Sequence, residues 1–147
     1  MIFERLVGMR RKLIATGIAI ILLLLLRKRF RFFMKNRSHR RRMGRFRKIA
    51  TDHPGTIEAA GAHYTMGLIF QNNMDCPQKA IQEYEKVLEI GSELADSALF
   101  NMGCCLENLG EEGRARKAFA DVLKKFPGST RVEDAQYKID ELALKNS

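Results

Sequence analysis

The sequence predicts an all-α fold: a short helical solenoid preceded by a single N-terminal transmembrane helix. Two observations lead to this prediction. Two stretches between Ala62 and Pro127 align with each other at a spacing of about 36 residues. A repeat of this period is typical of solenoids in which each unit contains two amphipathic helices. Ahead of the repeats, residues 13–26 form an uncharged, leucine-rich run, which is the composition expected of a membrane-spanning helix.

Short matching segments define the repeat. Residues 62–67 (AHYTMG) match residues 98–103 (ALFNMG), and residues 80–84 (AIQEY) match residues 115–119 (ARKAF). We therefore predict one helix pair in residues 56–92 and a second pair in residues 93–129.

Fragments of the same unit flank the two pairs. Residues 46–50 (FRKIA) and 53–56 (HPGT) resemble residues 119–123 (FADVL) and 126–129 (FPGS), which predicts a half-repeat in residues 39–55. At the other end, apolar residues recur at helical spacing, namely Val132, Ala135, Ile139 and Leu142. This pattern predicts a capping helix in residues 130–145 that covers the last apolar face. The helical domain as a whole is predicted to span residues 39–147.

A glycine midway along the first helix, an alanine and an aromatic residue on the second helix, and a closing proline resemble the tetratricopeptide repeat. The residues that carry this resemblance are Gly103, Ala115, Phe119 and Pro127 in the second unit and Gly67, Ala80 and Tyr84 in the first. The first unit departs from the pattern, because it has one extra residue between glycine and alanine and has Gly91-Ser92 in place of proline. The resemblance covers residues 39–145 and implies a scaffold that binds protein partners.

The same resemblance implies that the first helix of each pair lines a concave wall. The side chains placed on this wall, which we call the predicted groove, are Tyr64, Leu68, Gln71, Phe100, Cys104, Glu107, Tyr137 and Glu141. Family members that hold a peptide's terminal carboxylate use Lys and Asn on this wall. Here the first helix of the first pair presents Tyr and Leu, and the first helix of the second pair presents Phe and Cys. Three aromatic residues in register instead favour a helix or an extended peptide with apolar anchors. The alternative is that the aromatic side chains only pack between adjacent helices.

No pattern in the sequence predicts an enzyme, a cofactor or a metal site. The three histidines (His39, His53 and His63) are scattered, and the chain has no glycine-rich phosphate loop and no Ser/His/Asp set. Cys76, Cys104 and Cys105 are an odd number of cysteines without a second Cys/His pair at ligand spacing. Adjacent cysteines on a helix point about 100° apart, so reduced thiols are expected.

The charge is divided unevenly along the chain. Residues 1–54 contain 16 Lys/Arg against Glu4 and Asp52, a net charge of +14, and residues 55–147 contain 10 Lys/Arg against 15 acidic residues, a net charge of −5. A division of this size indicates a basic targeting or anchoring arm joined to a mildly acidic module.

Residues 13–26 are predicted to be an uncleaved transmembrane anchor that follows a basic flank in residues 1–12. Fourteen residues in a helix extend about 21 Å, less than the ~30 Å of a hydrocarbon core, but basic side chains at both ends can reach the headgroups. Three alternatives remain open: a cleaved secretory signal, which lacks a small-residue cleavage site here; a mitochondrial presequence; and a buried helix of a soluble domain.

Residues 27–38 are predicted to be a polybasic juxtamembrane arm. Its membrane-surface side chains are Arg27, Lys28, Arg29, Phe30, Arg31, Phe32, Phe33 and Lys35, a mixture that suits anionic lipid headgroups and the interface. Two alternatives are nucleic-acid or ribosome association through residues 27–48, and a plain flank that only sets topology. Residues 27–48 contain twelve Lys/Arg, so the positive-inside rule predicts a single-pass membrane protein with cytoplasmic repeats.

Overall fold

The computed structural model describes residue 27 and residues 38–145. The predicted basic flank 1–12 and the predicted anchor 13–26 lie outside the described residues. The same holds for the basic arm apart from its two end residues, Arg27 and Ser38; Arg27 is exposed. The predicted membrane-surface residues that fall outside are Lys28, Arg29, Phe30, Arg31, Phe32, Phe33 and Lys35.

All regular structure in the described residues is helical, as the sequence predicts. A helix at residues 38–52 is followed by α2 (Ile57–Asn73), α3 (Pro77–Ile90), α4 (Ala95–Asn108), α5 (Glu112–Lys125) and α6 (Val132–Leu144). None of the helices in this part of the chain combines the length and the apolar character that crossing a bilayer needs.

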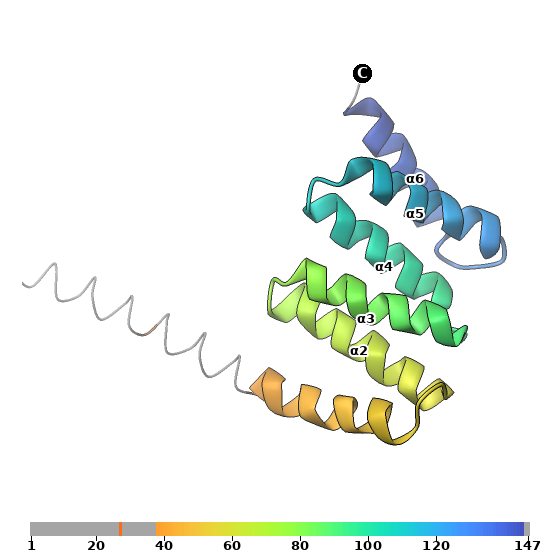
Figure 1. The fold of residues 1–147 in the computed structure, drawn as a ribbon. Coiled ribbons are helices and arrows are strands. Elements are labelled where there is room, and N and C mark those ends of the chain that lie inside the picture. Colours follow the sequence, from red (N-terminus) through yellow and green to blue (C-terminus); the bar gives the residue numbers. More distant parts are fainter. Residues whose placement is uncertain (1–26, 28–37, 146–147) are drawn as a thin grey trace, which may run out of the picture. The chain divides into compact units, whose positions relative to one another are not determined.

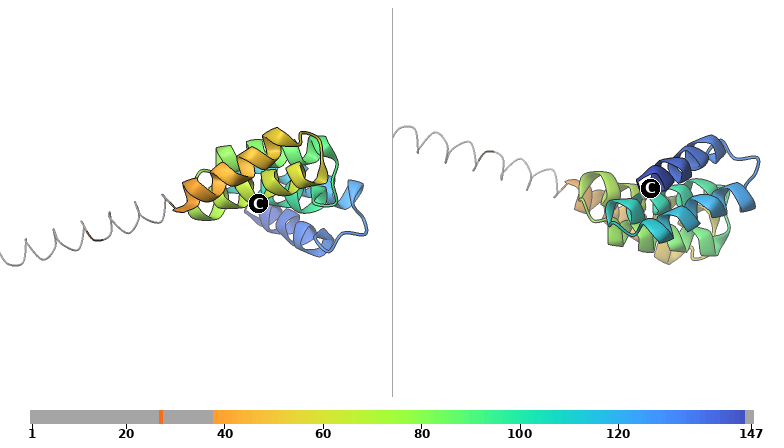
Figure 2. Two further views of the ribbon diagram at one scale, coloured as in Figure 1. Left: turned by 90° about the horizontal axis from the view of Figure 1, so that it is seen from below. Right: turned by 90° about the horizontal axis from the view of Figure 1, so that it is seen from above.

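The helices stack in chain order within one compact unit, His39–Ser147. The helix at residues 38–52 lies beside α2 at one end of the stack, α2 and α3 form one pair, α4 and α5 form the next, and α6 lies at the other end (Figures 1 and 2). Short turns join them, so each pair is a helical hairpin, and the arrangement is consistent with a tetratricopeptide-like solenoid.

A glycine and an aromatic ring bring the two helices of each pair close together. A Cβ atom on Gly103 would lie 2.6 Å from the nearest ring carbon of Phe119, and a Cβ atom on Gly67 would overlap the ring of Tyr84 in the same way. Both rings are fully buried. The glycine and the aromatic residue that recur in the sequence therefore contact each other, and each helix pair contains one such contact.

The ends of the helices follow from local chemistry. The Thr56 hydroxyl accepts a hydrogen bond from the Ala59 N–H at 3.2 Å and caps α2. Pro77 is the first residue of α3. A backbone N–H at this position has no partner within the helix, so the N–H that proline lacks costs no hydrogen bond. Gly91, with φ +74°, ends α3 in the left-handed conformation that a glycine adopts without strain. Cys76 precedes α3, and its side chain makes no capping hydrogen bond.

Helix α6 closes the stack with an apolar inner face and a polar outer face. Ala135 and Leu142 are fully buried where α6 packs on α5. At the places where α4 has the buried Leu99 and Gly103, α6 carries Gln136 and Asp140, which are exposed and joined by a 3.0 Å hydrogen bond. A polar outer face is what a terminal repeat needs for solubility.

Candidate functional site

Tyr64 joins the first helices of the two pairs. Its ring packs against that of Tyr84 on α3, with the centroids 5.9 Å apart, and its hydroxyl accepts a hydrogen bond from Asn101 Nδ2 on α4 at 3.1 Å. Tyr64 is half-buried: its ring packs on α3, and its hydroxyl group is hydrogen-bonded to α4.

Phe100 has the equivalent place in the second pair. Its ring packs against Phe119 on α5 at 5.4 Å between centroids, and the Arg131 guanidinium lies over it, 5.3 Å from the ring centroid. This cation–π contact links α4 to the start of α6. Phe100 is half-buried, so it belongs partly to the core and partly to the surface.

Tyr137 is the third aromatic of the predicted groove, and it is 68% exposed. Tyr64 and Phe100 each pack on the second helix of their own pair, and no described helix follows α6 to do the same for Tyr137. The three aromatic residues predicted to be in register therefore differ in how much ring surface a partner could reach.

Four charged residues form a network across α4 and α6. Lys138 Nζ lies 3.1 Å from Glu107 Oε2 and 2.9 Å from Glu141 Oε2, and Lys145 Nζ lies 3.4 Å from Glu107 Oε1. The hydrogen bond and charge of Lys138 lower the pKa of Glu141, and the hydrogen bond that Lys138 donates to Glu141 is the main cause that raises the pKa of Lys138. This network brings together Glu107 and Glu141 of the predicted groove.

Cys104 lies next to this network and is half-buried. Burial raises the pKa of its thiol to about 11 and that of the buried Cys105 to about 12. Both thiols therefore stay protonated near neutral pH and are poor nucleophiles. All three cysteines are free, and the described residues contain no cluster of three or more potential metal ligands.

The other two residues of the predicted groove lie on α2. Gln71 Oε1 accepts a 2.7 Å hydrogen bond from the Tyr84 hydroxyl, so this side chain is already engaged by the second helix of its own pair. Leu68 is half-buried. Neither residue is joined to the charged network on α4 and α6.

Sequence reasoning missed three residues that connect the first helices: Asn101, Arg131 and Lys138. Two of them leave a signal in the sequence, because Asn101 directly follows Phe100 and Lys138 precedes Glu141 by three residues, one helical turn. Arg131 precedes the first residue of α6, and its position over Phe100 depends on the turn that leads into that helix.

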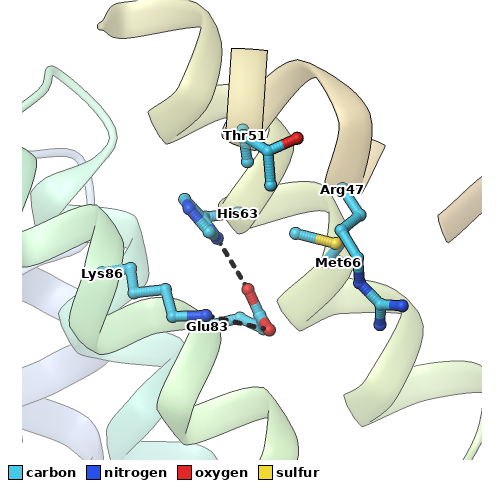
Figure 3. Close-up of a pocket in the computed structure, with 7 residues that line it drawn as sticks. Arg47, Thr51, His63, Met66, Glu83 and Lys86 are labelled. Carbon is cyan, nitrogen blue, oxygen red and sulfur yellow. Dashed lines mark hydrogen bonds and ion pairs between the residues drawn. The ribbon is translucent and has the colours of Figure 1, made fainter. Parts of the chain in front are cut away.

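A second feature is a pocket of about 410 Å³ between the helix at residues 38–52, α2 and α3 (Figure 3). Its lining residues are Arg47, Ala50, Thr51, His63, Met66, Glu83 and Lys86. At its centre, Glu83 Oε2 lies 2.7 Å from His63 Nδ1 and Glu83 Oε1 lies 3.5 Å from Lys86 Nζ. In the sequence, His63 is one of three scattered histidines, and no pattern pairs it with Glu83, twenty residues later.

Comparison with known proteins identifies one segment of the chain. Residues 97–129, which contain most of α4, all of α5 and the following turn, match the family model described as "Tetratricopeptide repeat". No curated protein matches the chain.

Proposed function

We propose that this chain, whose residues 97–129 match the tetratricopeptide repeat, is a non-catalytic adaptor that holds a protein partner at a membrane. In this role it binds the partner directly or serves as an accessory subunit of a membrane complex. Repeats of this family are commonly scaffolds for protein–protein interaction. The observation that carries the proposal is the accessibility of aromatic side chains on the first helices: Tyr137 on α6 is largely exposed, and Tyr64 on α2 and Phe100 on α4 are half-buried.

The partner segment is a helix or an extended peptide with apolar anchors. Tyr and Phe supply large contact areas at small cost in side-chain entropy, and interface hot spots are enriched in such residues. Charges beside them largely cancel, because Lys138 and Lys145 face Glu107 and Glu141. A near-neutral surface around aromatic residues favours apolar anchors over a highly charged ligand.

The test of partner binding is copurification from mild detergent. The full chain, a chain without residues 56–147 and a Tyr137→Ala variant are each purified with their bound proteins. We expect a protein that copurifies with the full chain, is lost without residues 56–147 and is reduced for Tyr137→Ala. A set of copurifying proteins that is identical for all three chains would contradict binding by the helical array.

The membrane part of the proposal rests on the sequence. Residues 13–26 are uncharged, basic residues lie on both sides, and the larger basic segment follows the run. We propose a single-pass anchor with the repeats in the cytoplasm and residues 27–35 at the lipid surface. If carbonate or high-salt washing released the full chain from membranes, residues 13–26 would not be an anchor.

A second candidate function is nucleic-acid or ribosome association through residues 27–48. One observation favours it: the helix at residues 38–52 has six basic side chains, and all six are exposed, namely Arg40, Arg41, Arg42, Arg45, Arg47 and Lys48. Such a density of charge suits phosphate backbones. Crosslinking of the full chain followed by purification distinguishes the two functions, since RNA as the dominant product would favour this one.

A further inference from the structure

Two polar side chains, His63 and Glu83, form a hydrogen-bonded couple in the first helix pair, at a place where the second helix pair is apolar. Aligned at the spacing of the repeat, His63 and Glu83 take the places of Leu99 and Ala118. Leu99 and Ala118 are buried, as this layer of a solenoid requires. His63 and Glu83 are also largely buried, with side chains 14% and 15% exposed, and lie 2.7 Å apart. An apolar pair of similar shape would serve packing at least as well, so packing alone does not account for the couple.

The couple forms one wall of the pocket, and the helix at residues 38–52 closes the other side. In Figure 3, His63 and Lys86 are both directed at the Glu83 carboxylate, and Arg47 lies on the other side of it from Lys86. Arg47 has no ion-pair partner within the described part of the chain. Lys86 is 48% exposed, and its contact with Glu83 is long at 3.5 Å, so its ammonium group can turn toward a ligand.

The charge of the pocket favours an anion. Arg47 and Lys86 are positive and Glu83 is negative, so one positive charge remains when His63 is neutral. Both Glu83 oxygens are engaged, by His63 and Lys86. The remaining basic side chains of the helix at residues 38–52 are exposed and do not line the pocket.

We propose that this pocket binds a phosphate group, with Arg47 and Lys86 as its charged partners, and that His63 holds Glu83 in place on the pocket wall. The donors come from two helices on different sides of the pocket, and a tetrahedral phosphate can accept hydrogen bonds from several directions. A planar carboxylate is matched best by a single guanidinium fork. The phosphate can belong to a soluble compound or to a lipid headgroup. This site is separate from the predicted groove and does not depend on partner binding there.

The test uses the full chain in non-ionic detergent, titrated calorimetrically with inorganic phosphate, sn-glycerol 3-phosphate or acetate at constant ionic strength. Arg47→Gln/Lys86→Gln removes both charges from the pocket. Arg45→Gln/Lys117→Gln is the matched control, because it removes the same charge from exposed positions that do not line the pocket. Thermal melting establishes that both variants are folded.

We expect the wild-type chain and the control to bind phosphate within twofold of each other, and the pocket variant to bind at least tenfold more weakly. Glycerol phosphate that binds at least as well as inorganic phosphate would identify a headgroup as the source, and preference for inorganic phosphate would identify a free ion. The proposal is overturned by equal weakening in both variants, by acetate binding as tightly as phosphate, or by the absence of phosphate binding in the wild-type chain.

Discussion

Tyr64, Phe100 and Tyr137 have equivalent places in the repeat, on α2, α4 and α6, but different surroundings. Tyr64 is held between Tyr84 and Asn101, Phe100 lies between Phe119 and Arg131, and Tyr137 is mostly exposed. Their spacing in the sequence predicts one aromatic row. The structure distinguishes them, because an aromatic side chain is buried only if the next helix covers it.

Truncation of Phe119, Phe100 or Tyr137 to alanine is expected to cost more stability the more deeply the ring is buried. Phe119→Ala should lower the free energy of unfolding by about 3–5 kcal/mol, because the ring is fully buried against Gly103. Phe100→Ala should cost less, although more than a surface site, since its half-buried ring packs on Phe119. Tyr137→Ala should stay within about 0.5 kcal/mol of wild type. Thermal and urea melts followed by circular dichroism measure all three.

Partner capture should respond most clearly to Tyr137. Tyr137→Ala is expected to weaken capture of a copurifying protein by about 2 kcal/mol, as removal of an interface anchor does, without a change in melting. Leu144→Ala is the control, because Leu144 is also largely exposed on the same helix but is not part of the predicted groove. Capture that is the same for Tyr137→Ala and wild type would exclude Tyr137 from the binding site.

At the scale of the helix pair, a glycine sets how closely two helices approach. Gly67→Ala and Gly103→Ala should each destabilise the fold by about 1–3 kcal/mol, since the added methyl group overlaps the ring of Tyr84 or Phe119. Gly113→Ala is the control. That glycine is also within a helix but has open space around its Cβ position, so alanine there should stabilise by roughly 0.5–1 kcal/mol. Equal melting of all three variants would contradict this packing.

The ion pair between Lys138 and Glu141, one turn apart on α6, is expected to make the stability of this helix depend on pH. The lowered pKa of Glu141 means that its ion pair contributes above the unfolded value near 4.5 and is lost as the pH falls through the folded pKa. The raised pKa of Lys138 means that its contribution is full below the unfolded value near 10.5 and is lost as the pH rises through the folded pKa. Amide hydrogen exchange of α6, corrected for intrinsic rates, should therefore be slowest between these limits. In Lys138→Gln this pH dependence should be smaller.

At the scale of the whole chain, the orientation in the membrane can be tested through the thiols. Burial raises the pKa of Cys104 and Cys105 to about 11 and 12, so both should react slowly. Cys76 is half-buried in the turn before α3 and is the most useful reporter. With cytoplasmic repeats, a cell-impermeant thiol reagent should label Cys76 after lysis but not in intact cells. Equal labelling in both would place the repeats on the outer side, and Cys76→Ser identifies the reacting residue.

Much of the helical array could be predicted from the sequence. The spacing of Gly67 and Gly103 and of Tyr84 and Phe119 predicts helix pairs, because each glycine is needed where one ring crosses the neighbouring backbone. The apolar spacing of residues 132–142 likewise predicts α6, whose buried residues include Ala135 and Leu142. These are local rules of helix periodicity and close packing, and they act within a few turns of chain.

The tertiary structure decided which side chains face one another across helices. The pairing of His63 with Glu83, the position of Arg131 over Phe100 and the charged network around Lys138 join residues that no repeat pattern relates. Helix periodicity predicts which face of its own helix a residue occupies. What that face meets depends on the angle and offset of the neighbouring helix, which many packed side chains set together. For this reason the sequence by itself determined the helices and their order, and only the packed array distinguished an exposed aromatic residue from a buried one and formed the pocket.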